Sequence, residues 1–241
     1  MRADRKRAPW AKREMPELDS AQPGFPTEEA RLLDYREEAG SCIVQLDTGH
    51  IYELALSSRP SQLPNPGDIL SAEIIAELVL GAERKVIARR VFSMLDKRLQ
   101  PEARIRSKLT DRGHTQAAIE AVLDQLRESG LHSDRRYAEA YCRDCLLSRT
   151  VGRRYLVQKL REKQIATDLA RRVAAEILDE ETEVALADRA AVTRWRKIRG
   201  PADYPALAKV VRFLMGKGFD AGLANSAARR AQPRPDEDSL F

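Results

Sequence analysis

The side chains best suited to chemistry in this sequence are arginines and lysines gathered in three segments of its C-terminal part. In the most basic segment, 152–164, five cations accompany a single acid, Glu162. Such clusters can neutralise nucleic-acid phosphates or meet an acidic protein surface, although an ordinary solvated helix face is the competing interpretation of each group taken singly. The candidate binding residues are Arg104, Arg106, Lys108, Arg112, Arg153, Arg154, Lys159, Arg161, Lys163, Arg194, Arg196, Lys197, Arg199, Lys209, Arg212 and Lys217, with Tyr155 and Trp195 interleaved among them. We expect Arg153 and Arg154 to face solvent.

Groups typical of catalysis or metal binding do not form a pattern. Cys142 and Cys145 make a C-x-x-C pair, but they lie in an apolar helical stripe and no second Cys or His pair has a compatible spacing. We interpret them as core thiols and expect no metal. The three histidines are scattered, and the sequence shows neither a Gly-rich phosphate loop after a strand nor a nucleophile elbow. We therefore expect no enzyme activity and no cofactor.

Composition favours a helical, soluble protein. Hydrophobic residues make up 43% of the 241 residues, which permits a core, whereas aromatic residues are 5% and charged residues 33%. The formal net charge is +5 and the pI is near 9.2. Three cysteines without a framework spacing fit a reducing compartment, and no run approaches the roughly 18 apolar residues of a membrane span. We expect a cytoplasmic monomer that contacts no membrane.

The elements that would position the cations begin with a short strand-rich segment. Residues 1–26 mix basic, proline and polar residues without periodicity, and we expect a disordered basic arm. In 27–70, alternation at Cys42, Val44 and Leu46 precedes Asp47-Thr48-Gly49 and a second apolar run, which predicts a hairpin or small meander followed by a linker. Ser71 then suits a helix N-cap, and Gly81 a stop or kink in that helix.

From residue 82 onward, one helical design recurs three times. Leu109, Leu160 and Leu214 fall in register, each followed by a turn and an apolar i, i+3, i+4, i+7 stripe. We predict a mostly α fold of three tandem three-helix units, within 71–130 (which includes a linker helix), 131–180 and 181–232, ahead of an acidic disordered tail at 233–241. In the turns, Gly113 and Gly218 suit a helix C-cap of positive φ, whereas the second unit has Gln164. We expect that turn to be strained or differently shaped.

The second unit carries a family resemblance. Ser133-Asp134-Arg135-Arg136-Tyr137-Ala138 opens its first helix, and Gly152-Arg153-Arg154 with Leu160-Arg161-Glu162-Lys163 forms its basic middle helix. With the closing helix of the first unit, at 117–131, these segments resemble the RecX family of bacterial regulators of the RecA recombinase. The resemblance implies a protein that lies in the groove of the RecA filament on single-stranded DNA and limits filament growth, ATP turnover, strand exchange and co-protease activity. Double-stranded DNA stays open as a further ligand.

Two further interpretations remain open at this level. Three-helix units of this size also suit helix-turn-helix domains, so a DNA-binding transcription factor is the alternative. The C-terminal Leu240 and Phe241 resemble the Leu-Phe peptides that dock on the bacterial sliding clamp, although Glu237 stands where those usually carry Gln, and a plain disordered end competes with that interpretation.

Overall fold

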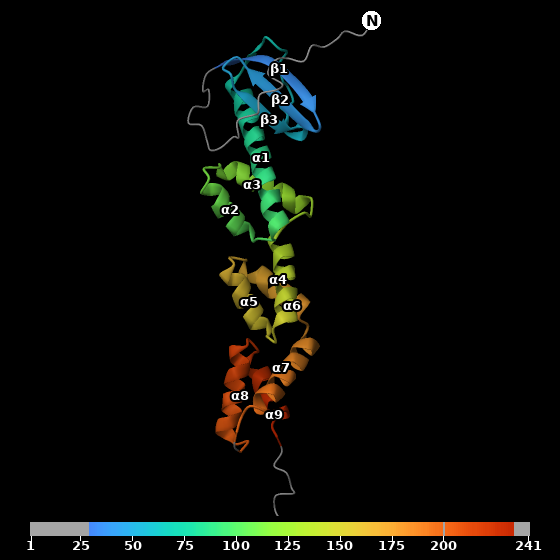
Figure 1. The fold of residues 1–241 in the computed structure, drawn as a ribbon, viewed down its shortest axis with the longest axis vertical. Coiled ribbons are helices and arrows are strands. Elements are labelled where there is room, and N and C mark those ends of the chain that lie inside the picture. Colours follow the sequence, from blue (N-terminus) through green and yellow to red (C-terminus); the bar gives the residue numbers. More distant parts are fainter. Residues whose placement is uncertain (1–28, 200, 234–241) are drawn as a thin grey trace, which may run out of the picture. The chain divides into compact units, whose positions relative to one another are not determined.

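The computed structural model describes residues 29–199 and 201–233. The expected basic arm at 1–26 lies outside this range, as do all but the first residue of the expected tail and, with them, Leu240 and Phe241. The chain divides into two compact units (Figure 1). One runs up to Met94 and includes Ser107–Val122, and the other comprises Leu95–Arg106 and the chain from Leu123 onward.

The first unit contains a four-stranded antiparallel sheet of order β3-β2-β1-β4. Its strands are β1 (Ala30–Glu38), β2 (Ser41–Leu46), β3 (Ile51–Ala55) and β4 (Ile69–Leu70). The predicted hairpin is confirmed, because Val44 pairs with Tyr52 and the connecting turn contains Gly49 at φ +83°. Sequence reasoning missed the preceding turn, where Ala39 and Gly40 both have positive φ, as the tight connection between β1 and β2 requires.

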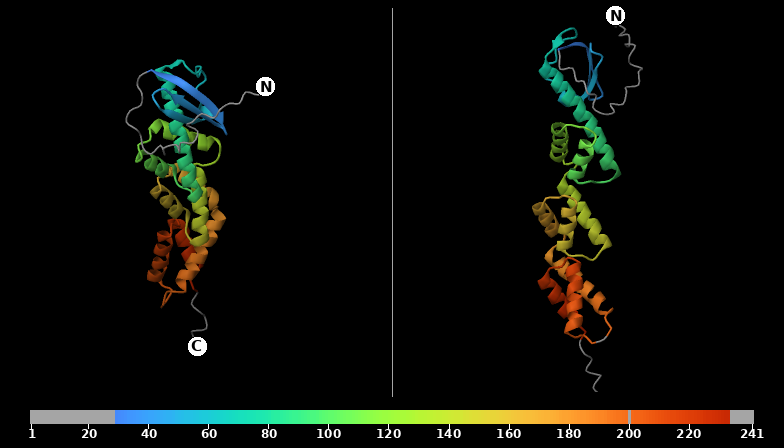
Figure 2. Two further views of the ribbon diagram at one scale, coloured as in Figure 1. Left: turned by 45° about the horizontal axis from the view of Figure 1, so that its top comes forward. Right: turned by 90° about the vertical axis from the view of Figure 1, so that its left-hand side faces the viewer.

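Helix α1 (Ala72–Lys97) packs its first turns against one face of this sheet (Figures 1 and 2). Ser71 supports its start as predicted, because the Ser71 hydroxyl accepts from the Ile74 amide at 3.5 Å. Of the two roles expected for Gly81, a stop or a kink, the stop was wrong, because α1 continues to Lys97. A Cβ at Gly81 would come within 3.3 Å of Leu54 Cβ and of the Ser58 carbonyl, so glycine here permits a close approach of helix and strand.

Eight further helices of the described chain complete the predicted fold of three three-helix repeats. The first repeat combines the C-terminal part of α1 with α2 (Glu102–Thr110) and α3 (Gln116–Glu128). The second contains α4 (Asp134–Ser148), α5 (Arg153–Glu162) and α6 (Thr167–Ile177), and the third α7 (Glu180–Trp195), α8 (Tyr204–Gly216) and α9 (Ala221–Arg230). The mostly α architecture with an N-terminal strand segment is therefore confirmed.

The three aligned leucines occupy the same place in three identical helix ends. The carbonyls of Leu109, Leu160 and Leu214 accept from the amides of His114, Ile165 and Phe219 at 3.2, 3.1 and 3.3 Å. The residue before each of those donors has positive φ: Gly113 at +80°, Gln164 at +64° and Gly218 at +85°. Each end is thus a Schellman motif. Contrary to one alternative we considered, the second turn keeps the shape of the others, and Gln164 adopts the left-handed conformation that costs a non-glycine residue about 1–2 kcal/mol.

The second and third repeats share one apolar cluster. Leu156, Leu160 and Phe219 are among its buried side chains, and so are three alanines of α9. Trp195, which the sequence placed among the basic residues, belongs to this core: it is 5% exposed and its indole Nε1 donates to the Ala228 carbonyl at 2.9 Å. The small side chains of α9 leave room for the indole, so Trp195 is not a surface for stacking bases.

Candidate functional site

Basic side chains gather around an aromatic ring at the start of α5. Arg149, which follows α4, donates from Nη1 to the Tyr155 hydroxyl at 2.6 Å. Lys159 Nζ lies 5.7 Å from the Tyr155 ring centroid and pairs with Glu162 at 2.7 Å. The hydrogen bond with Glu162 raises the pKa of Lys159, so the ammonium stays charged at neutral pH. We call Arg149, Tyr155 and Lys159 the Tyr155 cluster.

A second such group lies in the third repeat. The Arg194 guanidinium and the Lys217 ammonium each lie 5.3 Å from the centroid of the Phe213 ring. Cations over an aromatic face are attracted by the ring quadrupole, which orders these long side chains without neutralising their charge. We call Arg194, Phe213 and Lys217 the Phe213 cluster.

The two clusters lie on elements that touch. The Lys217 carbonyl accepts from the Gly152 amide at 3.0 Å, and the Gly218 carbonyl accepts from the Arg154 amide at 3.1 Å. A Cβ at Gly218 would come within 2.3 Å of the Tyr155 nitrogen, so the α8–α9 turn and the first turn of α5 meet backbone to backbone. Figure 1 accordingly draws α5 and α8 on the same side of their unit. With exposed Arg154, the clusters form a basic region that we call the junction surface.

Arg153 departs from the expectation that it faces solvent. Its Nε donates to the Leu178 carbonyl at 2.7 Å and lies 3.2 Å from Glu183 Oε2. The Arg153 side chain is 32% exposed and that of Glu183 is 11% exposed. Arg153 therefore connects α5 with the end of α6 and with α7, while Arg154 beside it is exposed as predicted.

The other predicted cations differ in exposure and location. Half-buried members of the set include Arg106, which pairs with Glu102 at 3.2 Å. Those of the first repeat are divided between the two compact units. The exposed members are Arg104, Arg112, Arg154, Arg161, Arg196, Lys197, Arg199, Lys209 and Arg212, and the remaining half-buried ones are Lys108, Lys163, Lys159, Arg194, Lys217 and Arg153.

Sequence reasoning missed Arg149 and Phe213. Arg149 stands outside the helical pattern, at the C-terminal cap of α4, and only the fold brings it to Tyr155. Phe213 lies next to the aligned Leu214, and its ring is partly exposed beneath two cations. The sequence signal that could have indicated these two residues is weak: basic residues on both sides of a helix that is partly apolar.

Nucleophiles and metal ligands do not converge in the described residues. Cys142 is buried, and burial raises the pKa of its thiol to about 11, so it is neutral and poorly reactive. Burial together with the neighbouring Cys145 raises the pKa of Tyr141. Within 29–199 and 201–233, no three His, Cys, Asp or Glu side chains gather as metal ligands. Over the same residues, no helix is long and apolar enough to span a bilayer.

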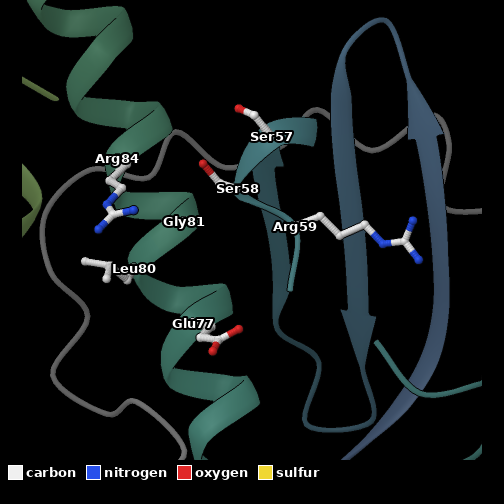
Figure 3. Close-up of a pocket in the computed structure, with 7 residues that line it drawn as sticks. All are labelled: Ser57, Ser58, Arg59, Glu77, Leu80, Gly81 and Arg84. Carbon is white, nitrogen blue, oxygen red and sulfur yellow. The ribbon is translucent and has the colours of Figure 1, made fainter. Parts of the chain in front are cut away.

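A small hollow lies between α1 and the 3-10 turn at Leu56–Ser58 (Figure 3). Two serine hydroxyls, Glu77 and Arg84 contribute to its lining. Arg59 also lines it, but Figure 3 shows its side chain extending away across the sheet, where it pairs with Glu37 at 2.7 Å and covers the Tyr35 ring. Only one guanidinium thus stands beside one carboxylate, and we assign the hollow no ligand.

Comparison with known proteins identifies the repeats. Residues 133–173 match the RecX second three-helix domain, and residues 181–227 match the RecX third three-helix domain. The chain is 34% identical to the regulatory protein RecX of Thermus thermophilus, over 64% of this chain and 95% of that protein. It is 32% identical to that of Corynebacterium efficiens, over 63% of this chain and 74% of the relative.

Solved structures agree on the fold. A crystal structure of regulatory protein RecX superimposes with a TM-score of 0.65, at 22% identity, over 83% of this chain and 99% of that one. RecX from Lactobacillus salivarius superimposes with a TM-score of 0.57 over 62% of this chain and 96% of the other. The sequence matches, the ordered repeats and the shared fold together show that the chain belongs to the RecX family of regulatory proteins.

Proposed function

We propose that this protein regulates the RecA recombinase by binding the groove of the RecA filament on single-stranded DNA. Binding there limits filament growth and thereby ATP turnover, strand exchange and co-protease activity. The protein acts as a cytoplasmic monomer, without a cofactor and without chemistry of its own.

The observation that carries this proposal, beside membership of the family, is the junction surface. It presents Arg149, Arg154 and Lys217 on elements that are in direct contact, and Glu162, three residues beyond Lys159, is already paired with that lysine. By contrast, Arg135 on α4 pairs with Glu139 at 2.9 Å and with Glu176 at 2.6 Å. Within the described chain, Arg149, Arg154 and Lys217 form no ion pair, so their positive charge can bind phosphates or an acidic face of the filament.

The deciding experiment measures RecA ATPase on single-stranded DNA with and without the protein, beside its binding to random duplexes. We expect inhibition of ATPase that increases with the concentration of the protein, together with weak, strongly salt-dependent binding to duplexes. Unchanged ATPase combined with tight binding to one duplex sequence would instead favour the helix-turn-helix transcription factor.

Charge reversal tests the surface itself. The double substitution Arg149→Glu with Arg154→Glu is expected to reduce inhibition at least about tenfold while leaving the thermal midpoint nearly unchanged, because Arg154 is exposed and Arg149 makes one exposed hydrogen bond. The matched control is Arg171→Glu with Arg172→Glu on exposed positions of α6. Equal loss in both pairs would point to net charge rather than to the junction surface.

The C-terminal Leu240 and Phe241 support a separate proposal, docking on the sliding clamp. Deleting both residues is expected to abolish clamp pull-down while leaving RecA inhibition intact. If the unaltered protein does not bind the clamp, this proposal fails without consequence for the first.

A further inference from the structure

The first turn of α5 is completed by the following repeat. Gly152 has no side chain with which to cap the helix, and α5 has no side-chain cap of its own. Instead the amides of Gly152, Arg153 and Arg154 donate to the Lys217 carbonyl, to Glu183 Oε1 at 2.8 Å and to the Gly218 carbonyl. Free amides at a helix start need acceptors, so the third repeat satisfies those of the second.

Glu183 and Arg153 lock this arrangement. One carboxylate oxygen of Glu183 accepts from the Arg153 backbone and the other faces the Arg153 guanidinium, which also donates to the Leu178 carbonyl. Glu183 is 8% exposed, so its charge is compensated by these donors and by the positive end of α5 rather than by water. Three helices of two repeats thereby meet at one ion pair.

This joint adjoins both aromatic and basic clusters. Tyr155 lies on the first turn of α5, two residues beyond Arg153, and Lys217 lies in the turn that receives the Gly152 amide. Any change in the angle between the repeats at this joint therefore changes the separation of the Tyr155 cluster from the Phe213 cluster. Glycines at 152 and 218 allow the close approach, and the ion pair between Arg153 and Glu183 connects α5 with α7 beside it.

We propose that Arg153 and Glu183 are positioning residues, which hold the Tyr155 and Phe213 clusters at a fixed separation so that both bind phosphates of one nucleic-acid strand at once. This inference rests on the proposed function. Neither residue contacts the strand. Two rigidly linked clusters bind a strand long enough to reach both with an avidity that each lacks alone, and loosening the link lowers the effective concentration of the second cluster.

The test compares short and long single strands. A dinucleotide with a single phosphate can occupy only one cluster at a time, and a strand of about 30 nucleotides reaches both. Glu183→Ala is expected to lower affinity for the long strand about tenfold or more while leaving affinity for the short strand unchanged. The matched variant Arg154→Met removes an exposed cation at the joint, and is expected to lower the affinity for both strands by a similar factor of a few-fold.

A distance measurement supplies an independent readout. Spin labels on the exposed positions Ala175 of α6 and Asn225 of α9, in a Cys145→Ser background, report the separation of the two repeats. We expect a narrow distribution in the unaltered protein and in Arg154→Met, and a broad one in Glu183→Ala. Glu183→Gln keeps an oxygen that can accept from the Arg153 amide, and is expected to restore much of the narrow distribution and of the long-strand affinity.

Each alternative outcome decides against the inference in a recognisable way. An unchanged distance distribution in Glu183→Ala would show that the ion pair does not set the separation. Equal losses for short and long strands in a folded Glu183→Ala or Glu183→Gln protein would show a merely structural role. Failure of the unaltered protein to bind either strand would overturn the phosphate contact and the avidity with it, whereas the RecA ATPase assay judges the proposed function separately.

Discussion

Helices α5 and α8 hold equivalent places in the second and third repeats, yet their N-termini are completed differently. The start of α5 takes its acceptors from the following repeat. In α8, Asp203 accepts from the Ala206 amide at 2.9 Å and Pro205 needs no acceptor. Relative to the aligned leucines, α8 also begins about one turn earlier than α5. The start of α5 in the second repeat thus depends on acceptors from the third repeat. In the third repeat, the last of the described chain, the cap of α8 comes from the same repeat.

The start of α2 resembles that of α5. The amide of Glu102 donates to Asp134 Oδ1 at 2.9 Å, and Asp134 is the first residue of α4 in the following repeat. An acid at the start of one repeat thus caps the middle helix of the repeat before it, twice along the chain. Each repeat should therefore stabilise the repeat that precedes it, as expected of tandem arrays whose units are too small to be robust alone.

The largest effect is expected from Gly218→Ala. Its φ of +85° disfavours any side chain, and the new Cβ would lie 2.3 Å from the Tyr155 nitrogen, a backbone atom that cannot give way. The free energy of unfolding should fall by about 3 kcal/mol or more, measured by urea denaturation. Gly216→Ala, at the last position of α8 with open space around it, is the control and should be neutral or stabilising by up to about 0.5 kcal/mol. Equal losses would mean that the contact between α5 and the α8–α9 turn contributes little.

A direct test of the two helix starts pairs Glu183→Ala with Asp203→Ala. Glu183→Ala removes a charged acceptor from the start of α5 and leaves part of the Arg153 guanidinium without its partner. We therefore expect the free energy of unfolding to fall by about 2 kcal/mol. This is less than for a fully buried pair, because the Arg153 side chain is 32% exposed. Asp203→Ala removes an ordinary cap, at about 1 kcal/mol. Chemical denaturation of both variants gives the ranking, and the reverse order would contradict the dependence of α5 on the third repeat.

Sequence periodicity predicted the repeats because their determinants are local. The leucines at 109, 160 and 214 recur with the turns that follow them, and each residue of a Schellman motif lies within six positions of the others. The joint was beyond reach because Glu183 is 30 residues from Arg153 and nothing near Gly152 marks the missing cap. For the same reason Arg153 read as a solvent-exposed cation and Trp195 as an interleaved aromatic, when both serve packing between distant helices.

Among the three helix ends, only the one at Gln164 carries strain from a side chain. Gln164→Gly should raise the free energy of unfolding by about 0.5–1 kcal/mol, because glycine adopts φ +64° without a Cβ clash. The gain is smaller than the full cost of the strain because glycine also increases the conformational entropy of the unfolded chain. Gln164→Ala is the control, and should gain nothing because alanine keeps the Cβ. A thermal midpoint raised equally by both substitutions would place the effect in the glutamine side chain rather than in the backbone.

A fall in pH should weaken the contact between the first and second repeats, which includes His132, before it weakens the contact between the second and third repeats at Arg153. His132 is 1% exposed, and burial lowers its pKa, although the Gln100 carbonyl, Glu102 and Asp134 oppose the shift. The unfolded chain therefore binds a proton at higher pH than the folded one. Stability is complete above the ordinary histidine pKa of about 6.5 and declines as pH falls below it, whereas Glu53 and Asp179, whose pKa values are lowered, lose their contributions only at more acidic pH.

The third repeat contains no histidine, so this decline belongs to the earlier part of the chain. We expect the thermal midpoint to fall measurably between pH 7.5 and pH 5.5, and His132→Leu to remove most of that fall. His114→Gln is the comparison and should remove less, because the Glu83 carboxylate at 3.4 Å partly stabilises charged His114 against the lowering of its pKa by burial. A pH dependence that survives His132→Leu unchanged would show that protonation of the first joint does not limit stability in acid.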